Sequence, residues 1–494
     1  MLEALAEDRL LMIPITDDER RALLMAAGRL SRPTRDEQVR VAKAFRKIDR
    51  KQRVQHDKDV RAESEIRRAR LDEVFQAPPR ALPPADVPER ELLKPRACYV
   101  CKALFTRVHF FYEALCPTCA PFNYDKRFQT ARLDGRVALI TGARLKIGYH
   151  AALMMLRAGA RVLVTTRFPH DAAERYAREA DYEDWKDRLQ VYGLDLRHTP
   201  SIELFAKHIE ATVPRLDIII NNAAQTVRRP PGFYKHLIER ELLAVSELAP
   251  GARPLLAQHQ ACVSALEAER KLPAGAGRDL RTWASAQARS AAGLLASAQL
   301  SLIPYAHDDA EPDQLAFPEG RLDADLQQVD LRGKNTWRLT LAEVSTPEML
   351  EVHLINAVAP FVLCAKLKPL MLRDRTDQKH IVNVSAMEGV FSRHTKTDKH
   401  PHTNMAKAAL NMMTLTSAPD YAKDGIFMNA VDTGWVTDED PQPLSQKKQE
   451  IHDFQPPLDI VDGAARICDP FFSGLLTGQH AFGKFFKDYK PSEW

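Results

Sequence analysis

The sequence of 494 residues predicts an α/β fold: a doubly wound parallel sheet with a helical N-terminal region, a small zinc module with four cysteines and a long helical insertion. The main observation is residues 133–167. Residues 137–140 form a short apolar run, and after Gly142 apolar residues recur at helical spacing as far as Gly159. A second apolar run at 161–165 follows directly. The order is therefore strand, helix and parallel strand, with backbone N–H groups at the helix start available for a phosphate.

Composition and charge narrow the class of protein. The 70 basic residues nearly balance the 66 acidic ones, which gives no reason to expect nucleic acid or an anionic membrane as a partner. Residues 1–14 carry acids where a signal peptide needs a basic start, and no apolar run approaches about 18 residues. We therefore expect a cytoplasmic protein of two or three domains without a membrane segment.

Residues 1–76 form a charged helical region. Thr16 and Thr34 each precede a glutamate by three residues, which is the pattern of a capping box at a helix start. We expect the second helix to run from 35 to 75. Its basic excess could touch phosphate, but a solvated helix face packed on a neighbour is favoured. Residues 77–95 contain six prolines and predict a stiff linker.

Residues 96–127, the four-cysteine module, contain two CxxC pairs, which form a metal-ligand pattern. Fourteen residues separate the pairs, and four thiolates close a tetrahedral shell without an open position for water. We therefore predict structural Zn²⁺ at this module; a redox pair and chance spacing are the alternatives. We expect the module to be joined to the rest of the chain in series, so that cofactor binding is independent of it. The predicted ligands are Cys98, Cys101, Cys116 and Cys119.

From residue 132 to 494, with an insertion at about 226–345, six segments resemble in order those of the short-chain dehydrogenase/reductase family. This resemblance implies a Rossmann-type sheet that binds a nicotinamide cofactor and transfers a hydride. The segments are the TGxxxGIG-like turn at 141–148, LDL at 194–196, DIIINNAA at 217–224, INAVAPF at 355–361, IVNVS at 381–385 and NAVDTGWVT at 429–437.

The resemblance also implies which residues hold the cofactor. Lys146 replaces the middle glycine of the first turn and could contact a phosphate, and Thr433 replaces a proline. The second strand ends in Thr166 and Arg167 without an acid, which favours NADP(H) over NAD(H); the alternative is that Arg167 points to solvent. The expected cofactor residues are Gly142, Arg144, Lys146, Ile147, Gly148, Thr166, Arg167, Asp195, Asn222, Ala223, Lys407, Thr433, Gly434 and Val436.

The active-site positions of the family are occupied by Asn356, Ser385, Thr403 and Lys407. The resemblance implies that Ser385 polarises a substrate oxygen and that Lys407 holds the nicotinamide ribose. Thr403 stands where the family has a tyrosine. An aliphatic hydroxyl ionises far less readily than a phenol with a pKa near 10, so another group must exchange the proton or the usual chemistry is absent. His400 or His402 could serve, although loop histidines are more often plain surface residues.

The insertion at 226–345 leaves from the sheet edge where ligands bind in such folds, so it could cover the substrate or make a subunit contact. Arg228 and Arg229 at its start are candidates to face the ligand. We expect an alanine-rich helical stretch around 255–300, flexible glycines at 274–277 and an acidic loop near Asp308. Residues 437–457 occupy the position of the substrate lid of the family.

These observations lead to two hypotheses. The first is an NADP(H)-dependent oxidoreductase that acts on a carbonyl or alcohol of a small molecule, as a homo-oligomer. The second is a catalytically inactive member that binds NADP(H) and regulates a protein partner through the N-terminal helices and the zinc module. Thr403 favours the second, whereas the presence of Asn356, Ser385 and Lys407 favours the first. Binding of nucleic acid has weak support, because zinc modules of this type are as often protein-interaction modules or purely structural ones.

Overall fold

The computed structural model describes residues 2–80, 90–270, 290–304, 315–393 and 395–494. Its centre is an eight-stranded sheet of order β10-β9-β8-β7-β6-β3-β4-β5. The strands from β9 to β5 are parallel, and β10 is antiparallel to β9. The predicted doubly wound parallel sheet is therefore confirmed. The strands are β3 (Val137–Thr141), β4 (Arg161–Thr166), β5 (Leu189–Gly193), β6 (Ile218–Asn221), β7 (Lys379–Ser385), β8 (Ile426–Asp432), β9 (Phe485–Lys487) and β10 (Lys490–Ser492).

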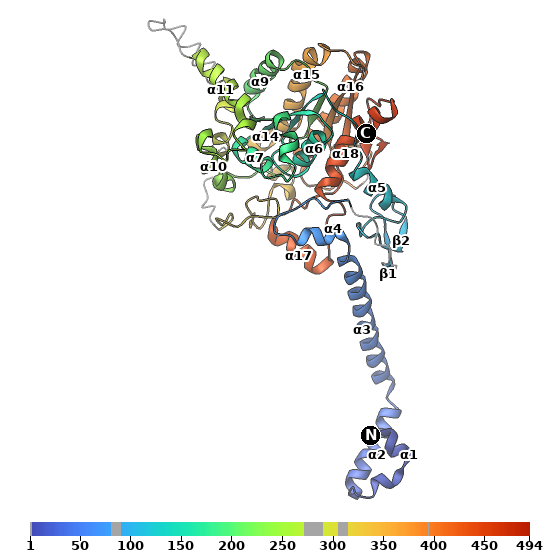
Figure 1. The fold of residues 1–494 in the computed structure, drawn as a ribbon. Helices are drawn as coiled ribbons and strands as arrows, with labels where there is room; N and C mark the ends of the chain where they lie inside the picture. The colour runs from blue at the N-terminus through green and yellow to red at the C-terminus, as the bar shows by residue number, and fades with distance from the viewer. Residues whose placement is uncertain (1, 81–89, 271–289, 305–314, 394) are drawn as a thin grey trace.

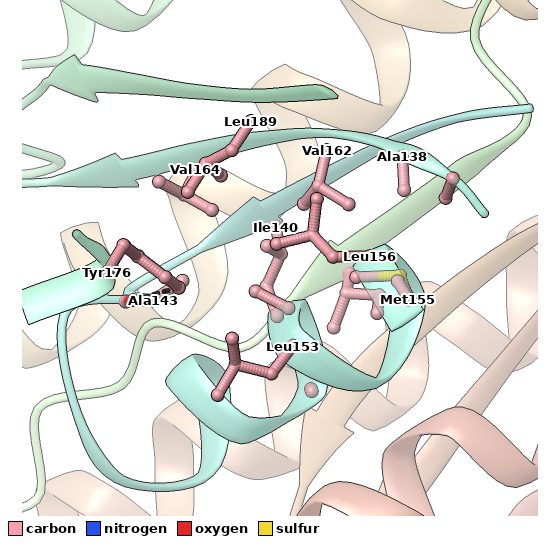
Figure 2. Close-up of a cluster of buried hydrophobic side chains, with 14 of the residues drawn as sticks. Ala138, Ile140, Ala143, Leu153, Met155, Leu156, Val162, Val164, Tyr176 and Leu189 are labelled. Atoms are coloured by element: carbon pink, nitrogen blue, oxygen red, sulfur yellow. Dashed lines mark hydrogen bonds between the residues drawn. The ribbon is translucent and has the colours of Figure 1, made fainter. Parts of the chain in front are cut away.

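Strand β3 is buried along its whole length, because helices cover both faces of the sheet. Ala138 pairs with Val162 and Ile140 pairs with Val164 on β4. Figure 2 shows the apolar side chains of α6 (Lys146–Arg157) packed against these strands. The predicted strand, helix and strand are thus present, and their packing fixes the turn that joins β3 to α6.

The helices form one layer on each face of the sheet. The first layer contains α6, α7 (Pro169–Tyr176) and α18 (Ile460–Thr477), and the second contains α9 (Thr199–Thr212), α15 (Ala359–Leu372) and α16 (Pro401–Lys423). The chain passes from β3 to β4 and β5 and then returns to β6 on the other side of β3. This reversal opens a crevice at the carboxyl ends of the strands, which is where ligands bind in such sheets.

A continuous helix runs from α14 (Thr346–His353) through a π-helical turn, η11 (Leu354–Val358), into α15. By length and composition alone, residues 346–372 could cross a membrane. Most of α15 is instead buried against α9 and the sheet, which accounts for its apolar composition. The sequence showed no uninterrupted apolar run of this length because four charged residues lie within it: Glu348, Glu351, Lys366 and Lys368.

The N-terminal region projects from the body as a helical arm (Figure 1). It consists of α1 (Leu2–Glu7), η1 (Arg9–Met12), α2 (Asp17–Ser31) and α3 (Arg35–Ala62). Both predicted capping boxes are present, since the backbone N–H groups of Thr16 and Thr34 donate to the glutamates three residues later at 3.0 and 2.8 Å.

Helix α3 ends at Ala62, so the expectation of a helix to residue 75 is wrong. Two short turns follow it, α4 (Glu65–Arg68) and η2 (Ala69–Leu71). The backbone N–H groups of Glu65 and Ile66 donate to the carbonyl oxygens of Phe110 and Phe111 in the four-cysteine module, at 3.0 and 3.2 Å. Because these two N–H groups bond to the module, they cannot form the hydrogen bonds that would continue α3 as a helix.

The four-cysteine module consists of β1 (Glu91–Ala97), β2 (Leu104–Arg107) and α5 (Cys119–Arg127). It packs on the Rossmann domain, because its buried aromatic residues share one apolar cluster with Val436, Leu458 and Ile460. Arg127 Nη1 also forms a buried ion pair with Asp459 at 2.6 Å. The expectation of a module joined only in series is therefore wrong. Residues 81–89 of the predicted linker lie outside the described part.

The described part of the insertion forms short helices that pack around the carboxyl edge of the sheet. Residues 274–277 and Asp308 lie outside it, and of the helical stretch expected at 255–300 it contains α11, α13 and η7. The backbone N–H of Asp195 donates to Gly293 O at 2.8 Å, and Ser297 Oγ donates to Arg167 O at 2.9 Å. These helices are η4 (Pro231–Tyr234), α10 (Lys235–Glu241), η5 (Val245–Glu247), η6 (Pro254–Leu256), α11 (Ala257–Arg270), α13 (Ala292–Leu295), η7 (Gln299–Leu302), η9 (Thr336–Arg338) and η10 (Leu341–Glu343).

The remaining short elements connect the strands. Ser345 Oγ accepts from the backbone N–H of Glu348 at 3.4 Å and caps α14, as the sequence predicted. The expected lid region contains α17 (Gln442–His452). The other connecting helices are α8 (Tyr182–Trp185), η3 (Lys186–Arg188) and η12 (Met387–Gly389).

Candidate functional site

A cavity of about 970 Å³ opens at the carboxyl edge of the sheet. This volume is in the range of cofactor sites. Residues after β3, β4, β6, β7 and β8 line it, together with the start of α16, parts of the insertion and the four-cysteine module. Of the site residues predicted from the sequence, all described by the structure, Asn356 and Thr403 do not line the cavity. The predicted residues that do are Gly142, Arg144, Lys146, Ile147, Gly148, Thr166, Arg167, Asp195, Asn222, Ala223, Ser385, Lys407, Thr433, Gly434 and Val436.

The turns after β3 and β6 pack closely against each other, and glycines make this close approach possible. Gly142 has φ +68°, and a Cβ atom at Gly148 would lie 2.4 Å from both Asn222 Nδ2 and Gly142 O, so a larger residue does not fit. Asn222 Nδ2 donates to Gly142 O at 3.0 Å. The N-cap of α6, Leu145, provides no side-chain hydrogen bond, which leaves the first N–H groups of this helix for an anion.

Lys146 takes a left-handed conformation, with φ +55°. This explains why a glycine suits the position, since an L-residue there costs on the order of 1 kcal/mol. Lys146 Nζ lies 3.6 Å from Asp325 Oδ2 of the insertion. Burial opposes the charge, but Asp325 and Glu439 outweigh burial and raise the pKa of Lys146. The lysine thus ties the insertion to the glycine turn, and its contact with a phosphate stays a prediction.

The end of β4 presents a cation to the cavity. Arg167 Nη1 donates to Ser301 Oγ at 3.2 Å and Arg167 Nη2 donates to Tyr234 Oη at 2.9 Å. Both partners are neutral hydroxyls of the insertion, so they orient the guanidinium without cancelling its charge. Thr166 Oγ1 accepts from the backbone N–H of Phe168 at 3.1 Å. Sequence reasoning found this cation but not the insertion residues that hold it.

Arg144 is buried and occupied within the protein. Its Nη1 atom donates to Asp171 Oδ2 at 2.7 Å, and its guanidinium lies 5.4 Å from the ring centre of Phe168. It therefore stiffens the wall of the cavity between β3 and α7. The insertion arginines are also paired: Arg228 Nε lies 3.5 Å from Glu351 Oε2, and Arg229 pairs with Asp330. Of these two, Arg229 lines the cavity.

Asp195 lines the cavity, but both of its carboxylate oxygens accept from Arg197, at 2.6 to 3.1 Å. Burial favours the protonated form, yet Arg197 outweighs it and lowers the pKa of Asp195. The carboxylate is therefore ionised, and both of its oxygens are already occupied by hydrogen bonds from Arg197. Its contact with an adenine ring, which the resemblance implies, would require Arg197 to move.

Asn356 lies in the π-helical turn η11 and is 1% exposed. It exchanges two hydrogen bonds with the backbone of Gln225: Gln225 N donates to Asn356 Oδ1 at 2.7 Å, and Asn356 Nδ2 donates to Gln225 O at 3.0 Å. Asn356 thus holds the loop after β6 in place from behind the cavity wall. Gln225 itself lines the cavity, and no local signal in the sequence points to it.

Ser385 and Lys407 line the cavity from β7 and α16. Ser385 Oγ donates to Asn411 Oδ1 at 2.5 Å, so its hydrogen is directed away from a substrate. Lys407 Nζ donates to Val384 O at 2.7 Å. Burial lowers the pKa of Lys407 to about 8, although Glu388 and Asp432 oppose the fall. Lys407 is thus a buried group that is mostly protonated at neutral pH.

On α16, the residues that face the cavity are His400, Asn404 and Lys407, at helical spacings of four and three. The imidazole of His400 stacks on Trp337 of the insertion, with ring centres 3.9 Å apart and planes at 4°. The backbone N–H of His400 donates to Leu339 O at 2.8 Å. The insertion therefore holds His400 at the N-cap position of α16, in a left-handed conformation with φ +42°. Burial lowers the pKa of His400.

Thr403 and His402 do not line the cavity. Thr403 is 1% exposed, and its Oγ1 atom has no hydrogen-bond partner among the described residues. His402 is buried, with Nε2 3.4 Å from Glu348 Oε1 on α14. The structure thus separates the two histidines that the sequence left as alternatives. The spacing of His400 to Lys407 could have identified the cavity-facing histidine, whereas Trp337 leaves no local signal.

The turn after β8 forms the remaining wall. Asp432 accepts from the backbone N–H groups of Met387 and Gly434, at 2.8 and 2.6 Å. Burial raises the pKa of Asp432. The backbone N–H of Trp435 donates to Tyr99 Oη of the four-cysteine module at 2.9 Å, and Tyr99 lines the cavity. Sequence reasoning missed Tyr99 because its partner in this contact lies 336 residues away in the chain.

The four predicted metal ligands converge, with their Sγ atoms all within 4.8 Å of one another. Cys101 Sγ and Cys116 Sγ are 3.6 Å apart. A tetrahedral zinc site with Zn–S bonds of about 2.3 Å requires thiolates about 3.8 Å apart, so the donors present fit this metal. Burial opposes ionisation of Cys116, but backbone N–H groups of Cys119 and Thr118 lower its pKa to about 7.

Comparison with known proteins gives matches to family models, to solved structures and to curated proteins. A family model described as short chain dehydrogenase matches residues 136–245, and one described as enoyl-(acyl carrier protein) reductase matches residues 320–457; together they span half of the chain. Among solved structures, the chain is similar to a dehydrogenase/reductase from Sinorhizobium meliloti 1021 (15% identity, 72% of this chain and 94% of that chain, TM-score 0.42) and a short chain dehydrogenase from Shigella flexneri (16%, 75% and 99%, 0.42).

Among curated proteins, the uncharacterized protein R665 of Acanthamoeba polyphaga mimivirus is 30% identical over 406 residues, which cover 80% of this chain and 74% of that protein. Dehydrogenase/reductase SDR family member 13 of Bos taurus is 38% identical over 93 residues (19% and 24%), and retinol dehydrogenase 11 of Mus musculus is 36% identical over 110 residues (22% and 34%). The match thus covers about a quarter to a third of these two dehydrogenases. The chain belongs to the short-chain dehydrogenase/reductase family.

Proposed function

We propose that this protein is an NADP(H)-dependent oxidoreductase that interconverts a carbonyl and an alcohol of a small molecule, with His400 exchanging the proton. The observation that carries this proposal is that one cavity contains the glycine turn, the Arg167 cation, Lys407 and His400. A nicotinamide cofactor bound there would supply or take up a hydride. Binding and proton transfer are left to residues of the chain.

The preference for NADP(H) rests on the end of β4. Arg167 is oriented by two neutral hydroxyls, so its charge is available to a ribose phosphate. The interlocked turns of Gly142 and Gly148 leave the start of α6 open to the diphosphate. Lys407 would hold the nicotinamide ribose, and its charge would favour a developing alkoxide over a neutral carbonyl.

His400 replaces the missing phenol as the proton-exchanging group. In the reductive direction, the imidazolium of His400 would give its proton to the oxygen of the substrate carbonyl. In the oxidative direction, the neutral imidazole takes the proton from the alcohol. Because burial lowers the pKa of His400, the neutral form prevails at neutral pH and suits the oxidative direction. Stacking on Trp337 holds the ring in one orientation.

A nicotinamide titration and a rate assay test the proposal together. NADPH should bind more tightly than NADH, as followed by nicotinamide fluorescence, and NADPH should be oxidised in the presence of at least one member of a panel of ketones and aldehydes. Lys407→Met should abolish oxidation. A protein that binds neither cofactor would contradict the proposal.

The second candidate is a cofactor-binding regulator without catalysis. It is favoured by the burial of Thr403 away from the cavity and by the hydrogen bond that takes up the hydrogen of Ser385. Under this hypothesis NADPH binds but is not oxidised with any carbonyl, and His400→Gln has no measurable consequence. The helical arm and the four-cysteine module would then contact a protein partner.

We also propose that the four-cysteine module binds one structural zinc ion. All four ligands are cysteines, and no coordination position remains for water in a tetrahedral shell. Zinc would hold the two CxxC turns together, and its chemistry there is limited to that role.

A further inference from the structure

We infer that the four-cysteine module is a wall of the cofactor cavity and that its metal-binding turn positions Tyr99 to hold the backbone of residues 433–436. The module thereby makes cofactor affinity depend on metal. The effect on the cofactor rests on the proposed function, whereas the effect on the backbone does not.

Tyr99 lies between Cys98 and Cys101, so its backbone belongs to the turn that would close around the metal. Backbone hydrogen bonds connect this turn to the rest of the module: Cys98 N donates to Ala103 O at 2.8 Å, and Tyr99 N donates to Ala114 O at 2.8 Å. The side chain of Tyr99 leaves the module and enters the wall of the cavity.

The phenol of Tyr99 contacts the turn that follows β8. Its Oη atom accepts from the backbone N–H of Trp435 at 2.9 Å, and Lys487 Nζ lies 5.5 Å from its ring centre. A Cβ atom on Gly434 would lie 3.3 Å from Tyr99 Oη, so the phenol packs directly on this turn. Gly434 has φ +78°, a backbone conformation that favours glycine. Because glycine is conformationally free, contacts with neighbouring residues hold this turn in one geometry.

The body of the module is anchored independently of any metal, since Tyr112 Oη donates to Asp462 Oδ1 at 2.5 Å and Arg127 pairs with Asp459 at 2.6 Å, both buried. Loss of metal therefore leaves the module docked but removes the link between Cys98 and Cys101. The expected result is a local loosening of Tyr99 and of the Trp435 N–H, without release of the module.

The test compares metal-loaded and chelator-treated full-length protein, each unmodified, as Tyr99→Phe and as Thr118→Ala. Thr118 is the matched control, because it lies in the second CxxC turn, is exposed and is not one of the residues that line the cavity. The first readout is hydrogen exchange at the Trp435 amide, which requires no cofactor. The second is the dissociation constant of NADPH.

Metal removal should speed exchange at Trp435 about 10-fold in the unmodified protein and in Thr118→Ala. Tyr99→Phe should exchange fast with metal still bound, and chelation should add little, because the same hydrogen bond is already lost. The NADPH dissociation constant should rise roughly 3- to 10-fold in the same pattern, the range expected for one hydrogen bond. Equal Trp435 exchange with and without metal in the unmodified protein would overturn the inference. The expected exchange pattern without any NADPH binding would support it and contradict the proposed function instead.

Discussion

Ser385 Oγ donates its hydrogen to Asn411 Oδ1 at 2.5 Å, inside a buried pair that continues from Asn411 Nδ2 to Gly389 O at 3.1 Å. We expect Ser385→Ala to lower the free energy of unfolding by about 1–3 kcal/mol, because a buried amide oxygen loses its donor. Carbonyl reduction should fall less than roughly tenfold. Urea unfolding and initial rates measure the two effects. A large loss of rate at unchanged stability would show that Ser385 acts on the substrate.

Lys407→Met should stabilise the protein while abolishing hydride transfer. The pKa of Lys407 is lowered from 10.5 to about 8 by burial, so its charge costs about 3 kcal/mol at neutral pH, offset by about 1 kcal/mol from its hydrogen bond to Val384 O. Because the folded pKa lies below the unfolded one, this cost is full below pH 8 and disappears as the pH rises towards 10.5.

The difference in unfolding free energy between Lys407→Met and the unmodified protein should therefore be about 2 kcal/mol at neutral pH. It should shrink and change sign as the lysine loses its proton. Denaturant titrations at a series of pH values measure it. A difference that is constant with pH would mean that Lys407 is not a buried charge.

Arg167→Ala should narrow the preference for NADPH over NADH by about 10- to 100-fold, since a hydrogen bond to a charged group contributes about 1.5–3 kcal/mol. Tyr234→Phe is the matched control, because it removes one partner of Arg167 and keeps the charge. It should leave most of the preference intact. Fluorescence titration with both cofactors gives the ratio, and equal affinities in the unmodified protein would refute the strand-end argument.

The purified protein should contain one zinc ion per chain, and Cys101→Ser should reduce this content. The physical reason is that four thiolates are needed to close the tetrahedral shell. Elemental analysis measures the content, with Cys262→Ser as the control, because Cys262 is a buried cysteine outside the module. A fully folded preparation without metal, with Trp435 still protected from exchange, would exclude the structural role.

The central sheet was predictable because apolar runs and glycine turns are local signals. The runs at 137–140 and 161–165 predicted β3 and β4, and the capping threonine at 34 predicted the start of α3. Contacts between distant segments were not predictable. The end of α3 is set by hydrogen bonds from Glu65 and Ile66 to the four-cysteine module, and no local pattern reports them.

The same limit applies to the site. The order of the family-like segments predicted that Ser385 and Lys407 share one cavity, but not the direction of the Ser385 hydroxyl, which depends on Asn411 on α16. Tyr99 and Trp337 reach the cavity from elements that the sequence assigned to a separate module and to an insertion. Only tertiary packing places their side chains there.

The most direct test of the central claim is the initial rate of NADPH oxidation with a carbonyl substrate between about pH 5 and pH 8. The rate is measured for the unmodified protein, His400→Gln, His402→Gln and Thr403→Tyr. His400→Gln should lower the rate roughly 100-fold or more and remove its decline with rising pH, because the group that gives the proton is lost. His402→Gln should retain both, since His402 faces Glu348. Activity found only in Thr403→Tyr would contradict the account and establish a cofactor-binding protein without catalysis.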